Sequence, residues 1–136
     1  MSLKKVLFLG FIYCFLVQNI WAQESHEKTM EATRVAIGSG STTELSKFFD
    51  SNFELSIKGK EYNKNQSSSA LRAFFQNNPP QGFSLIHQGA SDDESLKYSI
   101  GQYQSDGKSY RVLLRFKTSE MGSELYKLEF REIEKE

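Results

Sequence analysis

His87 is the side chain of this sequence best suited to proton transfer, because histidine titrates near neutral pH. It follows Phe83 and Leu85 in an alternating segment, and this alternation predicts that all three point to the same interior side. There His87 would act as a hydrogen-bonding group or a proton carrier. The competing interpretation, a partly exposed histidine bonded to a neighbouring strand or loop, is the one that the pattern favours.

The groups that catalysis would need beside His87 are missing from the pattern. No carboxylate stands at a clear inward strand position, and Asp50 follows a predicted helix, where it would cap backbone amides. Tyr98, Tyr110 and Tyr126 offer phenols, but aromatic residues at inward positions usually serve packing. The sequence contains neither a G-x-S-x-G elbow nor a glycine-rich phosphate loop. We therefore predict no catalytic residue, and keep as the alternative a small-molecule enzyme that uses His87.

Metal and cofactor sites are not predicted either. The two histidines, His26 and His87, are far apart in the sequence, and no acidic residue has a suggestive ligand spacing to His87. The one cysteine, Cys14, lies in the N-terminal apolar run. We expect neither a bound metal ion nor a cofactor.

Residues 1–22 have the pattern of a secretory signal peptide. Lys4 and Lys5 provide positive charge, Val6–Val17 is apolar, and Ala22 is a small residue at a plausible cleavage point. The apolar run is shorter than the roughly 20 residues of a membrane-spanning helix, although an uncleaved anchor is the alternative. We expect an exported protein, periplasmic or extracellular, in which residues 23–136 form a single domain that does not span a membrane after cleavage.

The composition suits one folded domain. The chain has 136 residues, of which 38% are hydrophobic and 13% aromatic, enough for a core and against wholesale disorder. Basic and acidic residues number 17 each, so the formal net charge is zero, and no block of like charge is present. This balance argues against a dedicated nucleic-acid binder.

The first half of the mature chain is predicted to be mainly helical. Glu27–Ile37 has helical spacing, Ser41–Glu44 matches a capping box at the start of a second helix, and Ser67–Gln76 forms a third. Residues expected on one face of the second helix are Leu45, Phe48 and Phe49. Asp50–Asn52 is expected to break that helix.

The second half is predicted to be strands. Phe53–Ile57 alternates, and Tyr62 begins a short return strand. Four antiparallel strands follow, over Phe83–Ala90, Leu96–Ser105, Ser109–Thr118 and Glu124–Ile133. Three helices from the N-terminal half, packed on an antiparallel sheet, make an α+β domain.

One run within this order is distinctive. Phe74–Ser91 reads FF-x-x-NPP-x-x-F-x-x-IHQG-x-S. Four shorter stretches accompany it, namely Ser46–Asp50, Lys97–Gly101, Tyr110–Val112 and Phe130–Glu134. Over Met30 to Lys135 the chain thereby resembles the uncharacterised bacterial secreted family called domain of unknown function 4783, departing from it at Lys58–Tyr62 and Asp92–Ser95. The resemblance implies a nuclear transport factor 2-like cone, three helices against a strongly curved sheet, and it implies no catalytic residue.

Strand alternation predicts which side chains line such a cone. The candidates for a pocket that holds a small apolar ligand are Phe83, Leu85, His87, Tyr98, Ile100, Gln102, Tyr110, Val112 and Leu128. The expected function is therefore that of an exported binding or interaction domain.

The opposite sheet face is predicted to be basic. It carries Lys97, Arg111, Arg115, Lys117, Lys127 and Arg131. Glu129 stands among them, and Tyr103 and Leu113 are expected to point outward too, which leaves room for a homodimer. This stripe is either a solvated sheet face that discourages edge pairing or a docking site for a protein partner or another anionic surface.

Overall fold

The structure is a computed structural model that describes residues 25–134. The predicted signal peptide, residues 1–22, lies outside the described residues. In the described part of the chain, no helix has the length and apolar character needed to cross a membrane. The helices are residues 25–38, α2 (Thr42–Ser46) and α3 (Lys64–Asn77), and the strands are β1 (Phe49–Ile57), β2 (Lys60–Tyr62), β3 (Gly82–Ala90), β4 (Leu96–Ser105), β5 (Lys108–Ser119) and β6 (Gly122–Ile133).

The first helix ends where the sequence predicts, in a turn that satisfies its last carbonyl groups. The Ser41 amide donates to the Ala36 carbonyl at 2.9 Å, and the Gly40 amide donates to the Ile37 carbonyl at 3.1 Å. Gly40 has φ +67°, a left-handed conformation that glycine adopts without steric cost. Ala36 and Ile37 are thereby fixed in the core.

The second helix is shorter than predicted. Ser41 caps it as expected, accepting the Glu44 amide at 3.2 Å, whereas the Glu44 carboxylate pairs with the Lys47 ammonium at 2.9 Å. Phe49, predicted on this helix, is instead the first residue of β1. The prediction was wrong here because Phe48 and Phe49 have helical spacing from Leu45, whereas Phe48 lies in the turn after α2 and Phe49 begins the strand.

The predicted helix break lies inside β1. The pairing of β1 with β6 shifts register between Phe49 and Glu54, and the Asp50 carboxylate accepts the Asn52 amide at 3.0 Å within that irregular stretch. Aspartate and asparagine commonly stabilise local turns in this way. The polar run therefore marks a distortion of the strand rather than the end of a helix.

The third helix begins three residues before the predicted start at Ser67. Asn63 accepts the Gln66 amide at 3.0 Å, and the Gln66 side chain accepts the Asn63 amide at 3.2 Å, a reciprocal capping box that the sequence analysis missed. The helix buries Leu71 and Phe74 against the sheet. It stops before the two prolines, as predicted.

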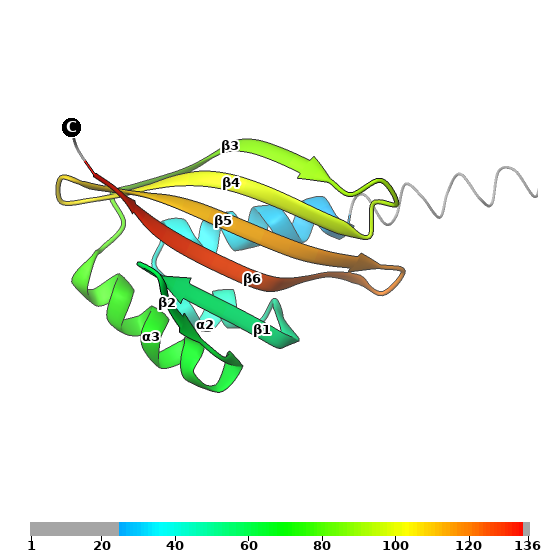
Figure 1. Ribbon diagram of the computed structural model, residues 1–136, viewed down its shortest axis with the longest axis horizontal. Helices are drawn as coiled ribbons and strands as arrows, with labels where there is room; N and C mark the ends of the chain where they lie inside the picture. Colours follow the sequence, from blue (N-terminus) through cyan, green and yellow to red (C-terminus); the bar gives the residue numbers. More distant parts are fainter. Residues whose placement is uncertain (1–24, 135–136) are drawn as a thin grey trace, which may run out of the picture.

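The six strands form one curved, unclosed sheet in the order β2-β1-β6-β5-β4-β3. All neighbouring strands are antiparallel except β1 and β6, which are parallel, so the sheet is mixed where an antiparallel sheet was predicted. Figure 1 shows the first helix behind β4–β6 and α3 alongside β1 and β2. We call the helix-covered side the inner face and the opposite side the outer face. The α+β class and the three-helix arrangement are confirmed.

The hydrophobic core fills the space between the inner face and the helices. Its buried residues are Ala36, Ile37, Leu45, Phe53, Leu55, Leu71, Phe74, Phe75, Tyr103, Tyr110, Val112, Leu114, Phe116, Leu125, Leu128 and Phe130. All six strands therefore contribute to one continuous core or pack against it, the short β2 through Tyr62 and the edge strand β3 through Phe83 and Leu85.

Candidate functional site

The interior of the cone is packed with its own side chains. Tyr110, Val112 and Leu128, predicted to line a pocket, are on the inner face and almost completely buried. Phe83 and Leu85 pack against the same cluster. These five residues thus contribute to the core instead of surrounding an open space.

Phe74 from α3 occupies the centre of this interior. Its ring centroid lies 4.4 Å from that of Phe130, 5.1 Å from that of Tyr110 and 5.6 Å from that of Tyr103. Aromatic rings at such separations are in direct edge or tilted contact. The helix therefore inserts a side chain where a bound ligand would have to lie.

The polar groups of the interior are engaged with one another. Asn78, just after α3, accepts a hydrogen bond from the Tyr110 hydroxyl at 2.9 Å and donates to the Phe74 carbonyl at 3.1 Å. The Tyr103 hydroxyl donates to the Asn78 carbonyl. Burial raises the pKa of Tyr103, with neighbouring Tyr110 adding to the effect. The two phenols hold the end of α3 to the sheet, and the raised pKa makes Tyr103 a poor proton donor to a substrate.

The predicted orientation of β4 was wrong. Tyr98, Ile100 and Gln102, expected inside, lie on the outer face, because they pair across the sheet with Arg115, Leu113 and Arg111. Tyr103, expected outside, is 0% exposed and pairs with buried Tyr110. Leu113 does point outward, as predicted.

Close packing explains why β4 turns its small residues inward. A Cβ on Gly101 would lie 2.6 Å from the Phe83 ring, and the Ser99 hydroxyl is 3.3 Å from the sulfur of Met30 on the first helix. No large side chain fits at either position. Tyr98 and Ile100 therefore point away from the core, and the inward alternation of β4 holds a large side chain only farther along, at Tyr103.

His87 lies on the outer face because β3 contains a bulge. The register with β4 shifts between Leu85 and His87, so that His87 pairs with Ile100, while Leu85 remains inside. The His87 imidazole is exposed, and its Nε2 lies 3.3 Å from the Tyr98 hydroxyl. In the described part of the chain, this phenol is its one side-chain hydrogen-bond partner, so no carboxylate orients it for acid–base work.

Lys97 was also wrongly placed by the prediction. It pairs with buried Phe116 and so belongs to the inner face, at the open end of the cone. There it borders a cavity of about 390 Å³, which His26 and Met30 of the first helix also line. Within residues 25–134, no group of three His, Cys, Asp or Glu side chains is placed to hold a metal ion.

His26 joins the first helix to the β5–β6 hairpin. It is 7% exposed, its Nδ1 lies 2.9 Å from the Ser123 hydroxyl, and its ring meets the Phe116 ring edge-on at 5.2 Å. Burial, with a contribution from the Lys97 charge, lowers the pKa of His26 to about 4. The imidazole is therefore neutral in the folded protein at physiological pH.

Stability is expected to fall on mild acidification because of His26. The unfolded chain binds a proton near pH 6.5 and the folded chain only near pH 4, so stability is constant above about pH 6.5 and decreases between these values. The loss by pH 4.5 is about 2 kcal/mol. Urea unfolding at pH 7.5 and 4.5 measures it: His26→Gln should show a smaller loss than wild type, whereas His87→Gln should not. Equal losses in all three would contradict this assignment.

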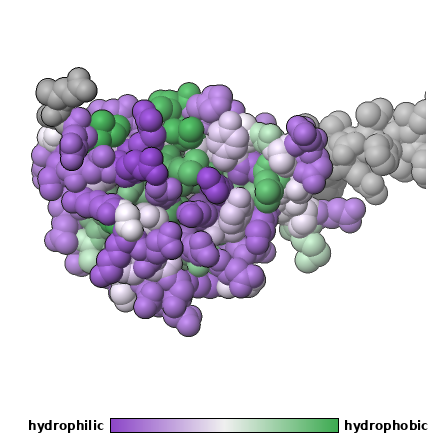
Figure 2. Space-filling view, in the orientation of Figure 1, coloured by the Kyte–Doolittle hydropathy of each residue, from purple (hydrophilic) through white to green (hydrophobic). Residues whose placement is uncertain are grey.

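The outer face of β4–β6 consists of three cross-strand rows. The rows are Gln102–Arg111–Arg131, Ile100–Leu113–Glu129 and Tyr98–Arg115–Lys127. In Figure 2 the outer face is toward the viewer, and hydrophobic residues lie across it between hydrophilic ones. A hollow of about 420 Å³ includes Tyr98, Leu113 and Arg115, and a smaller one of about 110 Å³ includes Arg111 and Leu113.

The predicted basic stripe is present on this face apart from Lys97. Arg131 pairs with Glu129 at 2.8 Å, and Lys117, beyond the three rows, lies 3.6 Å from the Asp50 carboxylate and over the Tyr126 ring. In the described residues, Arg111, Arg115 and Lys127 have no carboxylate within ion-pair distance. The charges of these three residues therefore stay available to an incoming anion.

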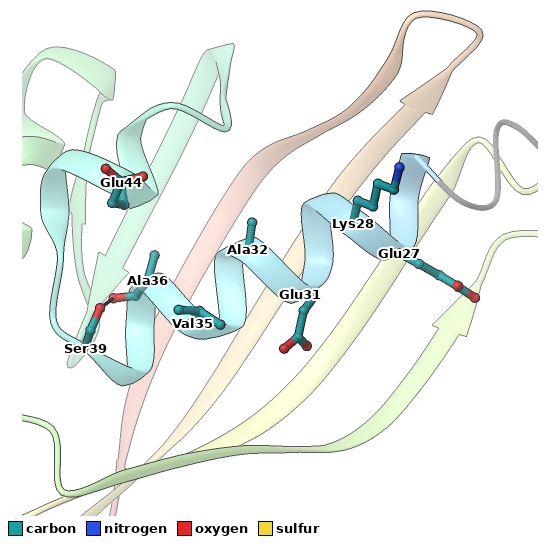
Figure 3. A pocket seen from close by; sticks show the side chains of 8 residues that line it. All are labelled: Glu27, Lys28, Glu31, Ala32, Val35, Ala36, Ser39 and Glu44. Carbon is teal, nitrogen blue, oxygen red and sulfur yellow. Dashed lines mark hydrogen bonds between the residues drawn. The ribbon is translucent and has the colours of Figure 1, made fainter.

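Sequence reasoning did not find the groove along the first helix. It measures about 590 Å³, with Ala32 and Val35 on its helical floor and Glu44 of α2 on its far side (Figure 3). Val35 is 52% exposed. The run of small and branched residues on an exposed helix face was the available signal. On the rim, a hydrogen bond from Arg34 lowers the pKa of Glu31.

Comparison with known proteins relates this arrangement to one family. The family model described as "Domain of unknown function (DUF4783)" matches residues 30–131. The structure is similar to that of a DUF4783 family protein from Bacteroides ovatus ATCC 8483, with 25% identity and a TM-score of 0.69 over 76% of this chain and 94% of that chain. Among curated proteins, none matches the sequence significantly.

Two further solved structures extend the likeness. A DUF4783 family protein from Bacteroides uniformis ATCC 8492 has 22% identity and a TM-score of 0.69, over 77% of this chain and 97% of that chain. A nuclear transport factor 2-like protein of unknown function from Burkholderia xenovorans LB400 has 13% identity and a TM-score of 0.59, over 84% and 88%. At these identities the similarity shows the fold alone.

Proposed function

The chain belongs to the family described as domain of unknown function (DUF4783), and from this premise we propose that it is a non-catalytic interaction domain that binds a protein partner on its outer sheet face. The observation that carries the proposal is the filled interior. Phe74, Tyr103 and Tyr110 occupy the space in which proteins of this shape could hold a small molecule. We therefore assign binding to the outer surface of the protein.

The outer face has the properties that recognition of a protein requires. Ile100 and Leu113 give it an apolar centre, Tyr98 adds an aromatic side chain, and Arg111 and Arg115 give it charge. Aromatic residues and arginine are enriched where proteins bind one another. The exposed His87 lies at the border of this face and would contribute a hydrogen bond rather than a proton-transfer step.

Export is part of the proposal. The charged start, apolar run and small residue within residues 1–22 support delivery of the domain to the periplasm or the exterior of a bacterial cell. The partner is accordingly a component of that compartment. Fusing residues 1–22 to a periplasmic reporter enzyme, and locating the reporter by fractionation, tests this element separately.

Site-specific crosslinking tests the use of the outer face. A photo-crosslinking benzoylphenylalanine placed at Leu113 should form a reproducible protein adduct in the envelope of the producing cell. The matched control carries the same group at Val35, which is exposed but lies on the first helix. Adducts at Leu113 that fade on replacing Arg111 and Arg115 by glutamate support the proposal. Adducts confined to Val35, or a small molecule retained in native mass spectra, would overturn it.

A further inference from the structure

The outer face sets like charges directly against one another. Arg111 of β5 is the register partner of Arg131 of β6, and Arg115 is the register partner of Lys127. Side chains opposite one another on the same face of an antiparallel pair are close neighbours, and like charges there are unfavourable. The arrangement therefore opposes folding at two places on one surface.

The same two strands also contain a pair of opposite charges that face each other. Farther along the ladder, Lys117 is opposite Glu124, the complementary pairing that sheets commonly use. Only one of the four facing cations is neutralised in the described chain, by the contact of Arg131 with Glu129. Three of the four cations thus remain without an ion-pair partner in the described chain, Arg111 at one place and Arg115 with Lys127 at the other.

The two pairs are separated by a fixed distance with an apolar residue between them. Arg111 and Arg115 are four residues apart on one strand, which corresponds to about 13 Å. Leu113 stands midway on the same face, opposite Glu129 and beside Ile100. A hollow lies on each side of Leu113, and each contains one of the two arginines.

We propose that this face recognises an acidic segment of another protein, with two carboxylates about 13 Å apart and an apolar side chain between them. The inference rests on the proposed function and adds the partner's chemistry. An extended segment presents this pattern with acidic residues four positions apart and an apolar residue midway. A second copy of this chain is a poor occupant, because its own cation pairs would face those of the first.

A synthetic peptide provides the probe. Ser-Thr-Glu-Thr-Leu-Thr-Glu-Thr-Ser has the required spacing, and the matched peptide with both glutamates replaced by glutamine lacks the charge. Fluorescence anisotropy with the purified protein should show saturable binding of the acidic peptide, at least tenfold tighter than binding of the glutamine peptide. Raising the salt concentration should weaken it.

Charge reversals in the protein locate the binding. The double variant Arg111→Glu/Arg115→Glu should weaken binding at least tenfold, whereas Arg72→Glu, on an exposed position of α3, should change it less than twofold. Thermal unfolding controls for misfolding: because Arg111→Glu relieves a like-charge contact with Arg131, its midpoint should equal or exceed that of wild type.

Several results would overturn the inference. One is that the wild-type protein binds the two peptides equally, or shows no saturable binding at millimolar peptide. Another is that Arg72→Glu weakens peptide binding as much as Arg111→Glu/Arg115→Glu does. A third is that the wild-type protein is a dimer that Arg111→Glu/Arg115→Glu dissociates. Tighter binding of inorganic polyphosphate than of the acidic peptide would also overturn it, since it would identify a general polyanion site. If adducts form at Leu113 but the protein does not prefer the acidic peptide, only the acidic character of the partner is refuted. If neither adducts nor peptide preference is found, the outer face as an interaction surface is refuted.

Discussion

Replacing Phe74 by alanine is expected to lower the free energy of unfolding by about 3–5 kcal/mol, the largest effect of any single change considered for this chain. The ring is buried and contacts those of Tyr103, Tyr110 and Phe130. Its removal takes away the hydrophobic transfer energy of the side chain and leaves a cavity that the rigid sheet cannot close. Urea unfolding at neutral pH measures the change.

Two further variants make this result specific. Phe74→Leu keeps most of the buried volume and should lose less than half as much stability as Phe74→Ala. Arg72→Ala, on an exposed position of the same helix, should change the stability by less than about 0.5 kcal/mol. If Phe74→Ala lowered the free energy of unfolding by less than about 1 kcal/mol, the interior would not be filled as described. A ligand bound inside the cone would then be favoured.

Replacing Gly101 by valine should cost about 3 kcal/mol, at the upper end of what overpacking usually causes. A Cβ at this position would lie 2.6 Å from the Phe83 ring and 2.9 Å from the Ser84 carbonyl oxygen. The ring could move, but the backbone oxygen belongs to the paired strand β3 and could yield only by disturbing the ladder. The shift of the thermal midpoint and urea unfolding both report the loss.

Gly82 supplies the matched control in the same pair of strands. A Cβ there has its nearest neighbour 4.0 Å away, at the flexible end of Gln104, so Gly82→Val should change stability by less than about 1 kcal/mol. If Gly101→Val were as stable as Gly82→Val, β4 would have room for larger inward residues. The explanation given for its orientation would then be incorrect.

The sequence predicts an element well where one periodicity dominates it. In β5, Tyr110, Val112 and Leu114 alternate with charged or polar neighbours for much of the strand, and the inner face was correctly predicted. In β4, apolar side chains occur in both alternations, with Tyr98 and Ile100 in one and Tyr103 in the other. The size of the side chains then favours the wrong alternation as the inward one. The correct choice depends on Phe83 and Met30, which leave room only for small residues at the inward positions that they contact.

Irregular pairing sets the second limit on prediction. The bulge of β3 places His87 on the opposite face from Leu85, and the local sequence contains no signal that predicts this bulge. The basic outer face was predicted from strand alternation, with Lys97 as the exception. That Arg111 faces Arg131, however, depends on the register between two strands, which only the assembled sheet defines. The fold class and surface charge were therefore predictable, but the arrangement of the candidate site was not.

The parallel pairing of β1 with β6 has a consequence for the time at which this protein acquires its structure. β1 ends at Ile57 and β6 begins at Gly122, so the sheet is completed only by the last strand of the described residues. Contacts between such distant segments form slowly, because a long loop must close first. We therefore expect the sheet of this protein to be completed late in folding, when β6 takes its place between β1 and β5.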